Sequence, residues 1–152
     1  MIIDAYNHVW RPKPNAPELF MHEGLSPEHD NDYIVEAVRK FPTRLIGFME
    51  VNPRDADAAD TIRRYARAPG IKGLKLHPTM MGHPVSSHPL MDPIFKTCAD
   101  TGLAVYGHCM HDFWTTPLQY EEMARTFPDV PLILGHMGIL WSVAEAGMVA
   151  KR

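Results

Sequence analysis

Two short apolar runs, GLAVYGH at residues 102–108 and PLILGH at residues 131–136, decide the fold class, because each one reads as a buried strand that ends in a histidine. Between them, Thr116-Pro117 predicts the start of a helix and Phe127-Pro128 predicts its end. Two strands joined by a helix within about 30 residues form a βαβ unit, whose strands are parallel and whose crossover is right-handed. The two histidines should therefore lie at the same edge of one sheet, where α/β folds carry their chemistry.

The rest of the chain repeats this alternation of strands and helices. Further strands are expected at Met1–Val9, Leu45–Val51 and Ile71–Leu76, and further helices from Ser26 to Phe41, from Asp55 to Arg67, from Asp92 to Gly102 and from a capping box at Ser142 onward, with a loop over Thr79–Pro89. From Asn52 on, the polar residues that end the strands follow one another at intervals of 25 to 31 residues. This period predicts an α/β fold, namely a single TIM-barrel-like (β/α) domain over residues 1–152 that is incomplete, with about five parallel strands and without the last strands of the barrel.

Composition restricts the class of protein further. Hydrophobic residues make up 45% of the chain and charged residues 22%, as in ordinary globular domains, and the net charge of −3 argues against nucleic acid or an anionic membrane as a partner. No apolar stretch approaches the roughly 20 residues of a membrane span, and the first residues lack the basic region of a secretion signal. The two cysteines lack the spacing of a metal or redox motif. We therefore expect a cytoplasmic protein.

Polar side chains follow the predicted strands in pairs. Residues two apart in a strand share a face, and four such pairs stand at strand ends: Tyr6 with His8, Glu50 with Asn52, Lys75 with His77, and Tyr106 with His108. A single histidine at a strand end often only hydrogen-bonds a backbone carbonyl. Histidines at four of the predicted strand ends make that explanation less probable for the group, because charged or imidazole groups that face inward are costly unless they are paired or bind a ligand.

Imidazoles that converge on one point are the usual protein site for a divalent transition metal. His8, His108 and His136 could supply the roughly three protein ligands that a catalytic zinc needs, with His77 as a further candidate. Lys75 either orients an acidic substrate or pairs with Glu50; the sequence leaves both possibilities open.

At these residues the chain resembles a known family. The motifs are IDAYNH at residues 3–8, GLKLHP at 73–78, VYGH at 105–108, and FPD at 127–129 followed by LGHMG at 134–138. In combination they resemble the amidohydrolase superfamily, in the branch that includes aminocarboxymuconate-semialdehyde decarboxylase. The resemblance implies a TIM barrel that binds a divalent metal, with Zn²⁺ favoured and Mn²⁺ as the alternative. It also implies that His8 and His108 are metal ligands and that His136 is the acid/base or substrate-polarising residue.

These considerations lead to a full set of predicted site residues. We expect His136 and Lys75 to be catalytic, His77, Tyr6 and Trp10 to contact the substrate, and His8 and His108 to bind the metal. The favoured function is a metal-dependent hydrolase of the amidohydrolase type that acts on a small, carboxylate-bearing substrate. A decarboxylase of the same family is the alternative within the enzyme class.

A third possibility is a catalytically silent, shortened relative with a binding or assembly role. It is favoured by Tyr6, which replaces the first histidine of the family's His-x-His pair, and by the expected absence of the ligand aspartate on the last strand. An open sheet would leave unpaired edges and bare apolar faces, so we also expect a homo-oligomer, with a dimer favoured. In such a dimer the partner subunit could lend a carboxylate, for which Asp112 and Glu145 are examples.

Overall fold

The computed structural model describes residues 30–110 and 112–152. In chain order the elements are α1 (Asn31–Lys40), β1 (Gly47–Glu50), α2 (Ala58–Ala66), β2 (Ile71–Leu76), α3 (Pro78–Met81), α4 (His88–Thr101), β3 (Ala104–His108), α5 (Pro117–Thr126), β4 (Leu132–Gly135), the short turn η2 (His136–Gly138) and α6 (Val143–Val149). The predicted strand at Met1–Val9 lies outside the described residues, and so do Tyr6, His8 and Trp10.

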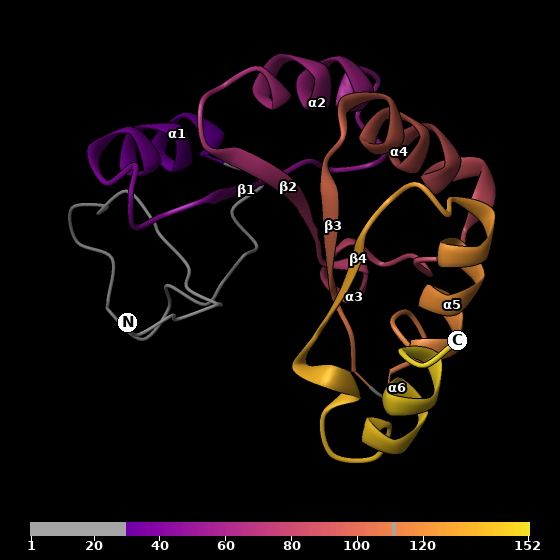
Figure 1. The fold of residues 1–152 in the computed structure, drawn as a ribbon. Helices are drawn as coiled ribbons and strands as arrows, with labels where there is room; N and C mark the ends of the chain where they lie inside the picture. Colours follow the sequence, from indigo (N-terminus) through magenta and orange to yellow (C-terminus); the bar gives the residue numbers. More distant parts are fainter. Residues whose placement is uncertain (1–29, 111) are drawn as a thin grey trace, which may run out of the picture.

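Within the described residues, four parallel strands form one sheet in the order β1-β2-β3-β4, and helices connect them (Figure 1). The α/β class and the parallel sheet predicted from the sequence are thus confirmed. The register pairs Lys75 of β2 with Glu50 of β1 on one side and with Tyr106 of β3 on the other. These three residues therefore form a row across one face of the sheet.

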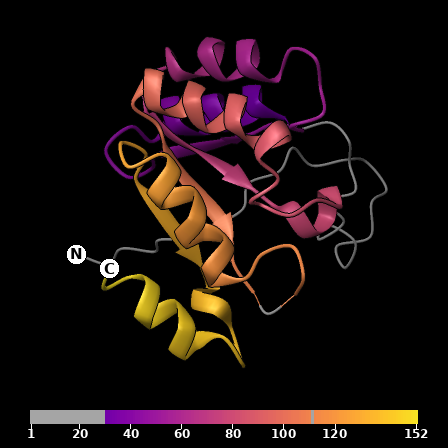
Figure 2. The same ribbon diagram turned by 90° about the vertical axis from the view of Figure 1, so that its right-hand side faces the viewer.

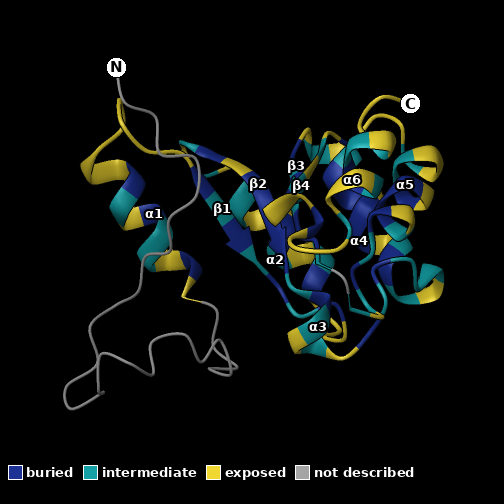
Figure 3. Cartoon of the chain, turned by 90° about the horizontal axis from the view of Figure 1, so that it is seen from below, coloured by how far each residue is buried: buried dark blue, intermediate teal, exposed yellow. Residues whose placement is uncertain are grey.

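The hydrophobic core lies between the other face of the sheet and the helices. Met49, Leu74 and Val105, one from each of the first three strands, are completely buried there, and Ile62 of α2 and Phe95 of α4 belong to the same cluster. Figures 1 and 2 show α1, α2, α4 and α5 on this outer side of the curved sheet, and Figure 3 shows that β2 consists largely of buried residues, while β1 alternates buried and intermediate ones. The opposite face of the sheet carries the row of Glu50, Lys75 and Tyr106.

One helix start differs from the prediction, and another lies outside the described residues. In the described part of the chain α1 begins at Asn31, where the side chain of Asp30 accepts a hydrogen bond from the Tyr33 backbone N–H, and the start predicted at Ser26 lies outside the described residues. The helix expected to start at Asp92 starts one turn earlier, at His88, and continues through Pro93. The predicted loop over Thr79–Pro89 contains the short helix α3 as well as this first turn of α4.

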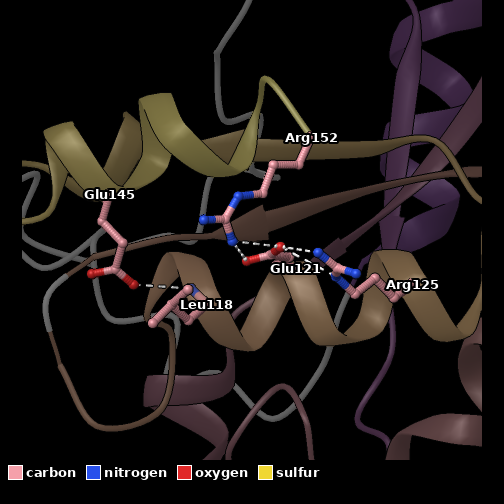
Figure 4. A network of polar contacts seen from close by, with 5 residues as sticks. All are labelled: Leu118, Glu121, Arg125, Glu145 and Arg152. Atoms are coloured by element: carbon pink, nitrogen blue, oxygen red, sulfur yellow. Dashed lines mark hydrogen bonds and ion pairs between the residues drawn. The ribbon is translucent and has the colours of Figure 1, made fainter.

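The C-terminal helix α6 is attached to α5 by polar contacts (Figure 4). The carboxylate of Glu121 on α5 accepts hydrogen bonds from Arg125 Nη2 at 2.7 Å and from Arg152 Nη1 at 3.1 Å. At the other end of α6, Glu145 Oε1 accepts a hydrogen bond from the backbone N–H of Leu118, 3.0 Å away, in the first turn of α5. Both ends of the α6 segment are therefore tied to the neighbouring helix.

The capping box expected at Ser142 does not form. Ser142 precedes α6 but its side chain makes no capping hydrogen bond, and the carboxylate of Glu145, which should complete the box, is used by α5 instead. The apolar run at residues 131–136 was expected to form a buried strand. It forms β4, which is an edge strand of the described sheet, and its Ile133 is 41% exposed. Among the described residues, none of the helices has the length and apolar character needed to span a membrane.

Candidate active site at the carboxyl ends of the strands

Lys75 lies in the middle of the polar face, one strand residue before the carboxyl end of β2. Its side chain is only 5% exposed, and its Nζ atom lies 4.5 Å from the centroid of the Tyr106 ring, over the face of the aromatic system. Burial lowers the pKa of Lys75 to about 8, against the opposing influence of the Glu50 carboxylate. A buried ammonium that releases its proton this easily can bind an anion and can also exchange a proton near neutral pH.

Three imidazoles gather at the carboxyl ends of β2, β3 and β4. His77 follows β2, His108 is the last residue of β3, and His136 follows β4. The rings of His77 and His108 are stacked, with centroids 3.8 Å apart and planes 19° from parallel, and the ring of His136 meets that of His108 edge-on, with centroids 4.8 Å apart. The structure thus brings together these three predicted histidines and places His108 between the other two.

The cluster holds its imidazoles in the neutral form. Burial is the main cause that lowers the pKa of His77 to about 4 and that of His108 to about 3. Lys75 lowers both values further, and His77 and His136 also lower that of His108. The pKa of His136 is lowered by burial and by Lys75. Neutral imidazoles have a nitrogen lone pair that can accept a proton or bind a metal.

His136 is held by an unusual turn of the backbone. His136 and Met137 both have positive φ angles, of 61° and 51°. The turn is closed by the backbone of Cys109, the residue directly after β3. Its N–H donates to the carbonyl of Gly135, and its carbonyl accepts from Gly138 N. Non-glycine residues in this conformation are uncommon and cluster at functional sites, so the turn agrees with a role for His136.

Asp112 is a further residue of this edge that the sequence reasoning placed only in a partner subunit. Its Oδ2 accepts a hydrogen bond from Thr79 Oγ1 at 2.7 Å, and its Oδ1 accepts from Trp114 N at 2.8 Å and from Thr115 Oγ1 at 3.0 Å. Partial burial raises the pKa of Asp112, but these hydrogen bonds and the nearby His108 outweigh it and hold the pKa below its ordinary value. The signal in the sequence was the Asp-x-Trp-Thr spacing, which is typical of an aspartate that caps its own turn.

The described residues satisfy part of what a metal site requires. His108 Nδ1 is buried and has no hydrogen-bond partner within residues 30–110 and 112–152, as expected of a nitrogen reserved for a ligand. In the same part of the chain, no three histidine, cysteine, aspartate or glutamate side chains are arranged to hold a metal ion. The second predicted ligand, His8, lies outside the described residues, so the metal site remains a prediction.

A family model described as "Amidohydrolase" matches residues 21–152. A search of curated protein sequences finds no match.

Several solved structures share the fold. The 5-carboxyvanillate decarboxylase LigW from Sphingomonas paucimobilis is 25% identical, with a TM-score of 0.58 over 71% of this chain and 40% of its own. The 5-carboxyvanillate decarboxylase from Novosphingobium aromaticivorans, complexed with manganese and 4-hydroxy-3-methoxy-5-nitrobenzoic acid, is 24% identical, with a TM-score of 0.59 over 71% of this chain and 38% of its own. The IDCase of Metarhizium anisopliae is 18% identical, with a TM-score of 0.56 over 71% of this chain and 36% of its own. This chain therefore spans about two fifths of the length of these structures.

Proposed function

This chain belongs to the amidohydrolase family, and on that premise we propose that it acts as a metal-dependent decarboxylase on a small aromatic carboxylate. The sequence favoured a hydrolase, with decarboxylation as the alternative. Two of the solved structures that it resembles are 5-carboxyvanillate decarboxylases, which supports the alternative over the hydrolase. The observation that carries the proposal is the gathering of Lys75, His77, His108 and His136 at one edge of the sheet.

Decarboxylation requires groups that this edge can provide. The bond between the ring carbon and the carboxylate carbon breaks, carbon dioxide leaves, and the ring carbon takes up a proton in its place. The enzyme must therefore bind an anion, stabilise the electron pair left behind, and deliver one proton. The buried ammonium of Lys75 is suited to binding the anion, because a charge–charge contact is strong where water is excluded.

We assign the proton transfer to His136. Its pKa is lowered, so once it is protonated its imidazolium gives up the proton readily to a carbon that carries an electron pair. His77 stacks on His108 and forms the wall of the site beside Lys75, where we assign it to substrate contact together with Tyr6 and Trp10.

The proposed metal ligands are His8 and His108. When bound there, a divalent ion would supply positive charge that orients the substrate and stabilises negative charge on it. The Novosphingobium aromaticivorans enzyme is complexed with manganese, which supports Mn²⁺ beside the Zn²⁺ favoured by the sequence. The neutral state of His108 fits this role, and so does its buried Nδ1, which has no hydrogen-bond partner among the described residues.

The proposal is tested first by measuring the binding of metal and ligand, and then by measuring the reaction itself. Mn²⁺ uptake is measured on protein purified without chelator, binding of 4-hydroxy-3-methoxy-5-nitrobenzoic acid is measured by calorimetry, and release of carbon dioxide is measured with 5-carboxyvanillate. We expect His108→Ala to lose Mn²⁺ uptake, and Lys75→Met to keep Mn²⁺ but to bind the nitrobenzoate at least about tenfold more weakly, as loss of a charge-assisted contact predicts.

Lys72→Met is the matched control, because Lys72 lies on the same strand with an exposed side chain. It should leave both binding measurements unchanged. Folded protein that takes up neither Mn²⁺ nor the nitrobenzoate would contradict the proposal and would favour the catalytically silent relative.

A further inference from the structure

The stacked pair of His77 and His108 lies just beyond the ladder of hydrogen bonds that joins β2 to β3. The last paired residues of β2 and β3 are Leu76 and Gly107, and the two histidines come directly after them in the chain. Parallel strands diverge once their hydrogen-bonded ladder ends, unless other contacts hold them together. A second connection beyond the ladder would hold the two rings at their separation of 3.8 Å.

Asp112 supplies that connection. Thr79 lies two residues after His77 and Asp112 lies four residues after His108, and the two side chains are joined by the 2.7 Å hydrogen bond from Thr79 Oγ1 to Asp112 Oδ2. Along the two chain segments, the stacked histidines thus lie between the last β2–β3 pair, Leu76 and Gly107, and the bond between Thr79 and Asp112.

The rest of the loop holds the Asp112 carboxylate in place. Its second oxygen accepts hydrogen bonds from Trp114 N and Thr115 Oγ1, so the side chain cannot turn away from Thr79 without losing them. Val85 N donates to the carbonyl of Trp114 at 2.9 Å, which is a second link between the loop after β2 and the loop after β3.

We propose that Asp112 is a positioning residue, which joins helix α3, after β2, to the loop after β3 and thereby keeps the rings of His77 and His108 stacked. It acts through its hydrogen bonds rather than through its charge. The proposal deepens the proposed function, on which it rests for its consequence, because the orientation of His108 decides where its free nitrogen points. The geometric claim itself concerns only residues of this chain.

The ring-proton resonances of His77 and His108 report directly on the stack. Each stacked ring shifts the protons of the other upfield, and a variant that is merely less stable but still folded would keep this shift. Spectra of wild type, Asp112→Ala, Asp112→Asn and Thr79→Val are recorded without metal or substrate. Asp129→Ala is the matched control, since Asp129 is exposed in the loop before β4, away from the histidine cluster.

We expect Asp112→Ala and Thr79→Val to lose the upfield shift, and Asp112→Asn and Asp129→Ala to keep it. An asparagine can still accept from Trp114 and Thr115 through its oxygen, and its amide can donate to the Thr79 hydroxyl. If Asp112→Ala does not fold, Thr79→Val removes the same bond from the other side with little change in shape.

An unchanged shift in a folded Asp112→Ala or Thr79→Val protein would overturn the proposal. A loss of the shift in Asp112→Asn as large as in Asp112→Ala would also overturn it, because the charge would then be the cause. Failure of Mn²⁺ or nitrobenzoate binding in the wild type would contradict the proposed function and would leave these spectra unaffected, so the two failures are distinguishable.

Discussion

The hydroxyl of Tyr120, in the middle of helix α5, donates a hydrogen bond of 2.7 Å to the backbone carbonyl of His108 at the end of β3. Tyr120 is 1% exposed, so this bond forms in the core and fixes the backbone of the central histidine from the helix side of the sheet. The imidazole of His108 points to the other face. The helix layer therefore supports the candidate site without contributing a side chain to it.

This contact depends on the absence of a side chain at Gly107. A Cβ at that position would collide with the ring and the hydroxyl of Tyr120. We expect Gly107→Ala to destabilise the protein by about 2 kcal/mol or more, because a fully buried aromatic ring has no room to move away. Urea denaturation measures the change.

The matched control is Gly147→Ala, in helix α6, where a Cβ meets no atom within 4 Å. Alanine favours the helix there, so this variant should be more stable than wild type by roughly 0.5–1 kcal/mol. Equal stability of the Gly107→Ala and wild-type proteins would show that Tyr120 does not occupy this place.

A second prediction concerns the pH dependence of stability. The imidazole of His88 lies between two carboxylates, with Nδ1 2.8 Å from Asp92 Oδ1 and Nε2 3.1 Å from Glu122 Oε1 on α5. These hydrogen bonds raise the pKa of His88 above its ordinary value. Protonated His88 therefore stabilises the folded state fully below the unfolded-state pKa of about 6.5, and the contribution is lost as the pH rises through the raised, folded-state pKa.

His88→Gln should consequently lower the melting temperature, relative to wild type, more at about pH 5.5 than at about pH 8.5. Adding Asp92→Asn and Glu122→Gln removes both carboxylates, and against that background His88→Gln should have the same small effect at both values. The prediction would be contradicted if His88→Gln alone lowered the melting temperature by the same amount at both values of pH.

The attachment of α6 gives a third prediction. Glu145→Ala removes the acceptor for the Leu118 N–H and should increase the rate of hydrogen exchange in the amides of α6. Glu145→Gln keeps a side-chain oxygen at the same place and should change the rate little. Hydrogen exchange followed by mass spectrometry measures both, and unchanged exchange in Glu145→Ala would mean that the bond between Glu145 and Leu118 does not stabilise the helix.

A fourth prediction concerns Tyr6, which lies outside the described residues. If Tyr6 occupies the position of a metal ligand, Tyr6→His should bind Mn²⁺ or Zn²⁺ more tightly than wild type, because an imidazole is a far better donor than a neutral phenol. Titration calorimetry measures the affinity. Tyr65→His, on the outer helix α2, adds an imidazole away from the candidate site and controls for non-specific binding. Equal affinity in both variants would count against a ligand position at residue 6.

The fifth prediction concerns assembly. Large apolar side chains are exposed on and after the edge strand β4, including Ile133 at 41%, Leu140 at 69% and Trp141 at 80%. Burial of such side chains against a second copy is favourable, so we expect a light-scattering mass close to twice that of the 17.2 kDa chain. Trp141→Lys should weaken the association, whereas Ile46→Lys, at an exposed residue before β1, should not. A mass of one chain at all concentrations would contradict the prediction.

The sequence was sufficient to predict those limits of strands and helices that depend only on residues close together in the chain. The apolar run Ile71–Leu76 forms β2 with the predicted limits, and Thr116 and Pro117 start α5 as a capping residue and a first-turn proline should. Gly102 ends α4 with a positive φ of 68°. Cap, proline and glycine signals act within one helical turn, so no tertiary contact is needed to interpret them.

Tertiary packing decided the features that the sequence did not. Helix α4 continues through Pro93 because Met91 and Ile94, on either side of it, are buried in the core and offset the lost backbone hydrogen bond. The pattern of strand ends predicted that His77 and His108 share one edge, but their stacking depends on the link between Thr79 and Asp112, which are 33 residues apart. Glu145 has the spacing of a cap for its own helix, yet it bonds α5, because α5 lies within reach only in the folded chain. Local signals thus determined the elements and the edge of the sheet that carries the histidines, and contacts between loops determined how those histidines are arranged.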